Sequence, residues 1–143
     1  MLVKDAMRKD VRTVRADSTV KEAAQIMTDN KIGGLVVVSG TGAVDGIVTE
    51  RDIMIDVVAK GRDANEIKVG YIMTKRVYVI DPHASLEDAA DVMTKYKIKK
   101  LPVVEEGVLV GMITASDLIR YEKTLIEKLS EIIGASPFKG VGG

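Results

Sequence analysis

The sequence predicts an α/β (α+β) fold in which two pseudo-symmetric β-α-β-β-α repeats pack sheet to sheet. The first indication is self-similarity. A Gly-x-x-Thr-x-x-Asp motif that starts at Gly46 recurs at Gly111, and similar segments flank it both times. In each copy, short β-branched runs alternate with segments whose apolar residues recur at helical spacing. Neither half has enough strand to cover both faces of its own sheet, so we expect the halves to pack on each other.

Each repeat begins with a predicted strand and a predicted helix. The strands are placed at residues 11–14 and 77–80, where β-branched residues dominate. Capping-box patterns at residues 19–22 and 85–88 then mark helix starts. Both helices contain an Ala-Ala-x-x-Met stretch and one narrow apolar stripe, which indicates a single buried face.

A hairpin and a second helix complete each repeat. The hairpin strands are centred on residues 35–38 and 101–104, and glycine-containing turns follow them. The second helices follow the aspartate of the motif, at residues 53–58 and 118–121. The pattern therefore predicts a connection from strand to helix at the motif in both repeats.

These elements divide the chain into a first repeat at residues 1–66, a second at 67–121, and a C-terminal helix with a tail at 122–143. That helix has no counterpart after the first repeat, and we expect it to end at Gly134. It is expected to dock an apolar face on the module or on a second copy of the chain. The face comprises Leu125, Leu129 and Ile132.

Composition excludes several classes of protein. The 21 basic and 21 acidic residues give a formal net charge of zero, so no global charge attracts nucleic acid. The absence of cysteine rules out disulfides and thiol nucleophiles, and the one histidine, His83, is interpreted as a loop residue and not a metal ligand. No apolar run is long enough to cross a bilayer and no signal-peptide pattern is present, so we expect a cytoplasmic protein without a membrane partner. No catalytic constellation is recognisable, so neither an enzyme nor a cofactor is predicted.

The duplicated motif can be interpreted in two ways. Backbone N–H groups at a helix start favour an anion, a threonine hydroxyl can add a donor, and an aspartate three residues later can accept from the two hydroxyls of a ribose. Alternatively, Thr-x-x-Asp is itself a helix cap, and duplicated helices need duplicated caps. The motif alone leaves both interpretations open.

The repeat, the Ala-Ala-x-x-Met helix, the Leu-x-Val-Val strand and the Gly-x-x-Thr-x-x-Asp turn together resemble the cystathionine-β-synthase (CBS) domain, which occurs in tandem pairs called Bateman modules. The resemblance covers roughly residues 1–121. It implies clefts between the halves for adenosine-containing ligands such as AMP, ADP, ATP or S-adenosylmethionine. It also implies that the aspartates hold the ribose, that the threonines contact ribose or phosphate, and that the adenine lies near the starts of the first and second strands. The implied nucleotide-binding positions are Arg12, Ile32, Gly33, Thr49, Arg51, Asp52, Tyr78, Ile98, Lys99, Thr114, Ser116 and Asp117.

The leading functional hypothesis is a regulatory sensor of adenosine nucleotides that forms at least a homodimer and acts on an unidentified protein. The clefts should differ, because Gly33 of the first repeat corresponds to Lys99 of the second and Arg51 corresponds to Ser116. One alternative is an assembly module with vestigial ligand sites. Another is nucleic-acid binding through the lysine cluster at residues 95–100, which the low aromatic content argues against.

Overall fold

The structure is a computed structural model that describes residues 1–134, and within them the predicted order of elements is largely confirmed. The first repeat contains β1 (Thr13–Val14), α2 (Val20–Asn30), β2 (Gly34–Val38), β3 (Val44–Thr49), α3 (Glu50–Ile53) and a π-helical turn, η1 (Met54–Val58). The second repeat contains α5 (Leu86–Tyr96), β4 (Lys100–Glu105), β5 (Val108–Thr114) and α6 (Ala115–Ile133). A one-turn helix precedes each repeat: α1 (Val3–Ala6) and α4 (Val69–Ile72).

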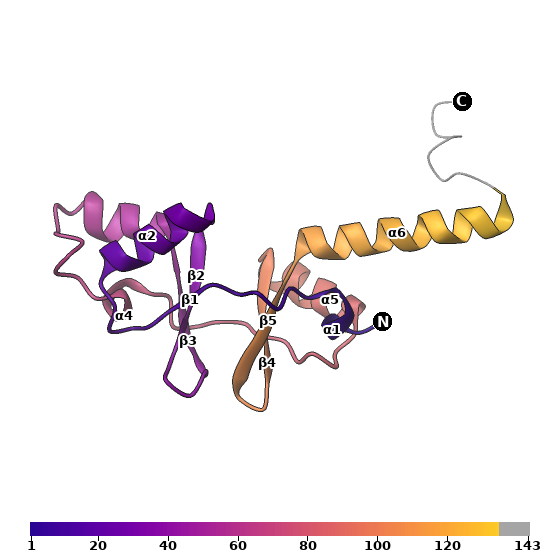
Figure 1. Cartoon of the computed structure of the whole chain (residues 1–143), viewed down its shortest axis with the longest axis horizontal. Helices are drawn as coiled ribbons and strands as arrows, with labels where there is room; N and C mark the ends of the chain where they lie inside the picture. Colours follow the sequence, from indigo (N-terminus) through magenta and orange to yellow (C-terminus); the bar gives the residue numbers. More distant parts are fainter. Residues whose placement is uncertain (135–143) are drawn as a thin grey trace, which may run out of the picture.

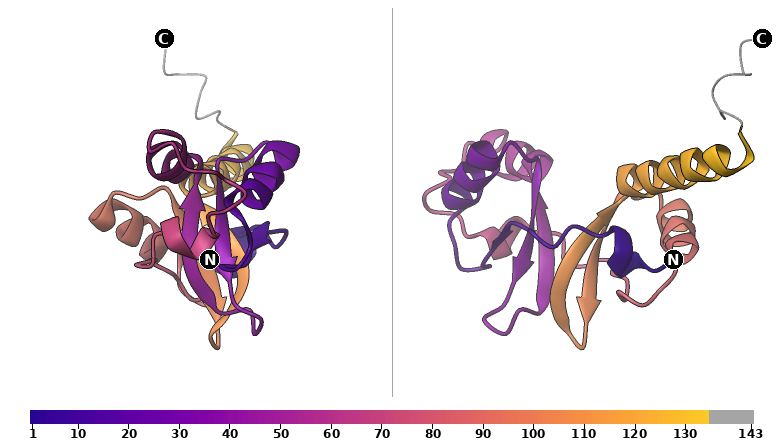
Figure 2. Two further views of the ribbon diagram at one scale, coloured as in Figure 1. Left: turned by 90° about the vertical axis from the view of Figure 1, so that its left-hand side faces the viewer. Right: turned by 45° about the vertical axis from the view of Figure 1, so that its right-hand side comes forward.

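The two sheets lie side by side in the middle of the molecule, and the helices lie on the outer sides (Figures 1 and 2). The first sheet has the order β1-β2-β3, with β1 parallel and β3 antiparallel to β2. The second sheet is the antiparallel pair β4-β5. Each sheet is covered by the longer helices of its own repeat and by the one-turn helix of the other repeat, and the buried apolar side chains form two separate clusters, one around each sheet. The predicted pseudo-symmetric architecture is therefore correct.

The strand predicted at residues 77–80 is the main departure from that architecture. Only Ile80 makes a ladder contact, a parallel bridge to Val103, whereas β1 pairs at both Thr13 and Val14. In the first repeat Thr13 pairs with Val36, and the residue that corresponds to Val36 is Pro102. Proline has no N–H to donate, so the ladder of the second repeat is shorter.

The segment that opens each repeat, residues 1–8 in the first and 69–74 in the second, is called its lead-in segment. Each lead-in segment packs on the opposite repeat. Arg8 exchanges two backbone hydrogen bonds with Met112 of β5, at 2.8 and 2.9 Å, and Thr74 makes the equivalent pair with Ile47 of β3, at 2.8 and 3.0 Å. Val3 is fully buried in the core of the second repeat. The two halves thus exchange their first segments, and the boundary placed between residues 66 and 67 remains a prediction.

Both helix starts have a side-chain cap, but of the two predicted capping boxes only the one at residues 85–88 is complete, and at 19–22 only the threonine half is present. The Thr19 hydroxyl accepts a hydrogen bond from the Glu22 N–H at 3.1 Å. Ser85 and Asp88 form the reciprocal capping box, at 2.9 and 3.2 Å. These caps fix where α2 and α5 begin, and so where their buried faces meet the sheets.

Helix α6 is longer and more exposed than expected. The two helical segments predicted at residues 118–121 and 122–133 form one helix of 19 residues, which ends at Gly134 with a left-handed φ of 72°. Its far half extends beyond the module (Figure 1), and the side chains predicted to dock are 39% (Leu125), 52% (Leu129) and 80% (Ile132) exposed. The prediction that this face docks on the module is therefore wrong for the described residues, because no element within 1–134 covers it. Docking on a second copy remains a prediction.

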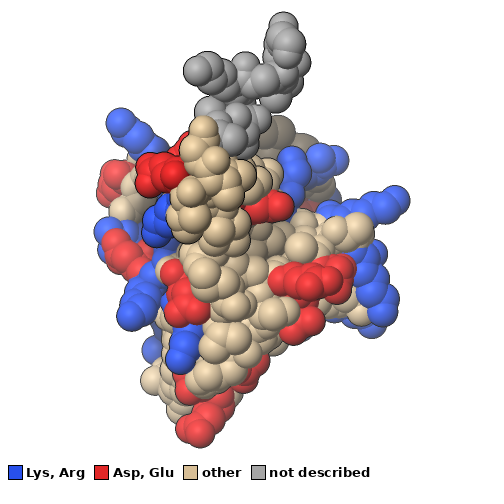
Figure 3. Space-filling model, turned by 90° about the vertical axis from the view of Figure 1, so that its right-hand side faces the viewer, with Lys and Arg blue, Asp and Glu red and all other residues tan. Residues whose placement is uncertain are grey.

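Seen from the end that carries α6, uncharged residues form a band down the middle of the surface, with charged side chains on both sides (Figure 3).

Across residues 1–134, every helix is too short or too polar to span a lipid bilayer.

Candidate functional site

In the first repeat the motif joins β3 to α3. Thr49 is the N-cap of α3, and its hydroxyl accepts from the Asp52 N–H at 3.2 Å. Asp52 Oδ2 accepts in return from the Thr49 N–H at 2.8 Å and from the Thr49 hydroxyl at 3.0 Å. The helix-cap interpretation therefore describes this geometry. It leaves Asp52 Oδ1 without a hydrogen-bond partner among the residues that the structure describes.

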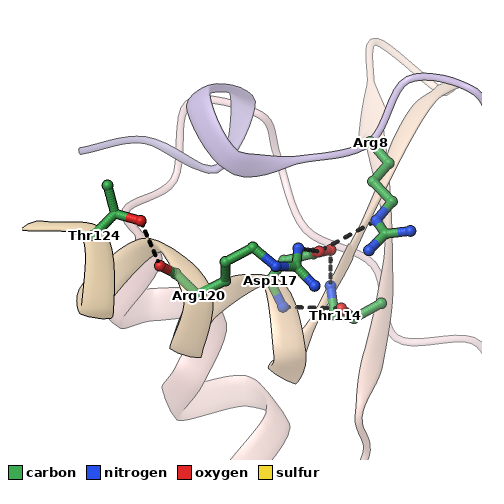
Figure 4. Close-up of polar contacts among 5 residues, drawn as sticks. All are labelled: Arg8, Thr114, Asp117, Arg120 and Thr124. Atoms are coloured by element: carbon green, nitrogen blue, oxygen red, sulfur yellow. Dashed lines mark hydrogen bonds and ion pairs between the residues drawn. The ribbon is translucent and has the colours of Figure 1, made fainter.

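In the second repeat the cap is the same, but the aspartate has two more partners (Figure 4). Asp117 Oδ2 accepts from the Thr114 N–H at 3.0 Å, and the Asp117 N–H donates to the Thr114 hydroxyl at 3.1 Å. Asp117 Oδ1 accepts from Arg8 Nε at 3.2 Å and from Arg120 Nη1 at 3.0 Å. The Asp117 side chain is only 3% exposed, so its charge is held almost wholly by these neighbours.

Sequence reasoning did not identify these two arginines. Arg120 lies three residues after Asp117 on a helix, a spacing that brings side chains together and could have indicated the pair. Arg8 is 109 residues away in the chain and reaches Asp117 because its segment crosses to the second repeat. No local pattern encodes that contact.

The neighbours of Asp117 set its protonation. Burial alone would raise the pKa of this carboxyl group. The hydrogen bonds from Thr114 and Arg120 and the positive charge of Arg8 outweigh burial, and the pKa lies below its ordinary value of 3.8. Asp117 is therefore an anion at neutral pH, the form in which both of its oxygens act only as hydrogen-bond acceptors.

A pocket of about 480 Å³ lies beside the motif of the first repeat. Two predicted positions, Ile32 and Gly33, line it, and Thr49, Arg51 and Asp52 do not. Its lining residues are Ala24, Met27, Thr28, Lys31, Ile32, Gly33, Glu50 and Ile53.

The pocket is joined to the motif through the backbone. The Glu50 N–H donates to the Gly33 carbonyl at 2.9 Å, so the start of α3 is tied to the start of β2. The Glu50 carboxylate also lies over Gly33, where an added Cβ would be 3.0 Å from Oε1. The first cleft thus combines apolar walls with one acidic and one basic residue, Glu50 and Lys31.

The remaining predicted positions are more dispersed. Arg12 Nε donates to Asn30 at 2.9 Å, and at the corresponding positions of the second repeat the rings of Tyr78 and Tyr96 stack with centroids 3.8 Å apart. Ile98 packs against the second core, and the Lys99 carbonyl accepts from the Ala115 N–H at 2.8 Å. The side chains of Arg51 and Ser116 are exposed.

Comparison with known proteins places these features in a family. The family model described as "CBS domain" matches the chain twice, at residues 3–58 and 69–124. The CBS domain-containing protein YhcV of Bacillus subtilis is 37% identical over 116 residues, which cover 81% of each chain.

Solved structures agree with the family match. The CBS domain pair of protein MJ0100, in complex with 5′-methylthioadenosine and S-adenosyl-L-methionine, superposes with a TM-score of 0.74 at 30% identity and covers 87% of this chain and 98% of that one. The hexameric CBS-CP12 protein from bloom-forming cyanobacteria superposes with a TM-score of 0.72 at 31% identity and covers 92% and 77%. With two family matches, a shared fold and a duplicated Thr-x-x-Asp turn, the chain belongs to the CBS-domain family as a tandem pair, a regulatory module.

Proposed function

We propose that this module senses adenosine-containing nucleotides, AMP, ADP, ATP or S-adenosylmethionine, in the clefts between its two repeats. The observation that carries the proposal is the duplicated motif, which holds one aspartate at the same position of a helix start in each repeat. Support also comes from the related pair in protein MJ0100, which was solved with two adenosine derivatives.

The chemistry of the first cleft suits a nucleoside. Asp52 Oδ1 can accept from the vicinal hydroxyls of a ribose, and charge-assisted hydrogen bonds of this kind are among the strongest in proteins. Ile32 and the backbone of Gly33 line the pocket and offer an apolar surface that a purine can approach closely, once the Glu50 carboxylate that lies over Gly33 moves aside. Neither role needs a catalytic group, in keeping with a regulatory module and not an enzyme.

We further propose that the chain forms at least a homodimer and passes the signal to a partner protein that is still to be identified. Apolar side chains of η1 and α6 support the dimer, because a lone chain leaves them in water. They include Met54 (61% exposed), Ile55 (47%), Val58 (68%) and Ile119 (68%). A relative of similar fold is described as hexameric.

The test is a thermal-unfolding panel with AMP, ADP, ATP, S-adenosylmethionine and NAD. A ligand that binds only the native state should add about 2.7 kcal/mol of stability at 100 times its Kd. Asp52→Asn and Asp117→Asn keep the shape of the side chain and remove the charge. Each should weaken binding at its own cleft by about 10- to 150-fold, the equivalent of about 1.5–3 kcal/mol.

The competing interpretations predict different results. If no adenosine compound raises the unfolding temperature, the proposal fails and an assembly module is favoured. If the aspartate variants change stability but not affinity, the motif is a helix cap only. Oligonucleotide binding that falls steeply with salt would instead favour the cluster at residues 95–100, where Lys95 Nζ lies 5.4 Å from the centroid of the Tyr96 ring.

A further inference from the structure

We propose that Arg8 and Arg120 make the second cleft selective for phosphate-bearing adenosine ligands, by moving from Asp117 to the phosphate when a ribose takes the carboxylate. This inference rests on the proposed function and assigns a ligand class to one of its two clefts. It is carried by the contacts drawn in Figure 4.

The two arginines are placed to contact a ligand. Asp117 is buried, but the side chains of Arg8 and Arg120 are 61% and 62% exposed. Each guanidinium has five N–H donors, and only Nε of Arg8 and Nη1 of Arg120 are within bonding distance of Asp117. The remaining donors are available to a phosphate, which a guanidinium binds in a bidentate manner.

The charges at this site distinguish between ligands. Asp117 Oδ1, which the ribose requires, is already shared by the two guanidiniums. When a neutral nucleoside hydrogen-bonds to this oxygen, the two guanidiniums lose their negative partner, and the nucleoside brings no negative charge to replace it. A nucleotide supplies a phosphate in its place, so phosphate and ribose should bind together at this cleft. A cationic group, such as a sulfonium, should be disfavoured.

The first repeat lacks both arginines and serves as an internal comparison. Thr74 occupies the position of Arg8, as their matching backbone bonds to β3 and β5 show, and Ile55 occupies the position of Arg120, three residues after the aspartate. The nearby pocket is lined by both Glu50 and Lys31, and within residues 1–134 no guanidinium holds Asp52, so a neutral nucleoside that takes Asp52 Oδ1 displaces no cation. The first cleft should therefore accept adenosine without a phosphate, and the second should require one.

The test uses titration calorimetry with adenosine and AMP on the Asp52→Asn protein, so that the second cleft dominates the signal. We expect AMP to bind at least about ten-fold more tightly than adenosine. Replacing both arginines, Arg8→Gln with Arg120→Gln, should weaken AMP by about 10- to 150-fold and leave adenosine unchanged or tighter, because Asp117 Oδ1 is then free. Arg15→Gln is the control for charge loss, since Arg15 lies beside Gly40 at the hairpin turn.

If the arginines select for phosphate, the double variant loses affinity for AMP but not for adenosine. If they only support the fold, the variant loses affinity for both ligands. Equal affinities for AMP and adenosine, or a parallel loss of both, overturn this assignment and leave the proposed function standing. If neither ligand binds the wild-type protein, this assignment fails, and the proposed function fails with it only if ADP, ATP and S-adenosylmethionine do not bind either. Arg8→Gln alone changes only an exposed side chain, so it should give the same direction of change in a protein that folds normally.

Discussion

Asp52 and Asp117 occupy the same place in a duplicated motif, yet their surroundings differ. Both cap a helix through the threonine three residues earlier, so the cap cannot distinguish them. Two arginines contact Asp117, and no arginine contacts Asp52 in the described part of the chain. Both aspartates are helix caps, and we predict that the neighbours of each, rather than the cap, decide which ligand it accepts.

The depressed pKa of Asp117 predicts a pH dependence of stability. In the folded protein the pKa of Asp117 lies below the ordinary value of 3.8, so the carboxylate keeps its charge at lower pH than it does in the unfolded chain. The resulting stability is present above about pH 4 and is lost as the pH falls through the folded-state pKa. Asp117→Asn should lower the free energy of unfolding by about 1–3 kcal/mol at pH 7.

Urea titrations of the wild-type and Asp117→Asn proteins between pH 7 and pH 2.5 measure this effect. The difference between the two proteins isolates Asp117 from the other carboxylates, and it should be constant near neutrality and shrink below pH 4. A difference that stays constant down to pH 2.5 would show that the charge of Asp117 contributes nothing.

The glycine that opens the motif is explained by the crossing lead-in segments. A Cβ at Gly111 would lie 2.6 Å from the Met7 sulfur and 2.9 Å from the Arg8 carbonyl, and a Cβ at Gly46 would lie 2.7 Å from the Thr74 carbonyl. Gly111→Ala should destabilise the fold by about 1–3 kcal/mol, because the opposing backbone must move.

The matched control is Gly34→Ala, where the added Cβ meets only ordinary contacts at 3.5 Å or more. Urea midpoints of both variants test the explanation. Equal effects at Gly111 and Gly34 would mean that the crossing segment is not tightly packed.

At the scale of elements, one residue accounts for the difference between the two sheets. Pro102 stands where Val36 pairs with β1, and it has no N–H for the strand expected at residues 77–80. Pro102→Val should restore one ladder hydrogen bond and raise stability by about 0.5–1.5 kcal/mol. Amide exchange provides the readout, since the new N–H at position 102 should be protected. Rapid exchange at that amide would contradict this explanation.

The sequence predicted those features that depend on local patterns. Capping boxes located α2 and α5, and the duplicated motif located the junctions of β3 with α3 and of β5 with α6. Features that depend on distant contacts were missed. Arg8 reaches Asp117 only through the exchange of segments, and no element among residues 1–134 covers the exposed far half of α6.

At the scale of the whole molecule, the exposed half of α6 predicts association. An isolated helix of this length is marginal in water, so the part beyond the module needs a partner to remain folded. We predict that light scattering at micromolar concentration gives at least a dimer. Leu129→Glu, in the middle of the exposed face, should shift the equilibrium toward monomer.

Ser130→Glu is the control, because it adds the same charge at the adjacent position of the helix without replacing an apolar side chain. A strictly monomeric mass for the wild-type protein, or equal masses for the two variants, would show that this helix face is not an interface.

The position at which an adenosine ligand binds can be read from amide NMR spectra of the wild-type protein during an AMP titration. We predict saturable shifts concentrated at residues 49–52 and 114–117, together with the Nε–H signals of Arg8 and Arg120. The shifts at residues 114–117 should saturate at lower AMP concentration than those at 49–52. An absence of shifts, or shifts confined to residues 95–100, would contradict the proposal that adenosine nucleotides bind at the two Thr-x-x-Asp motifs.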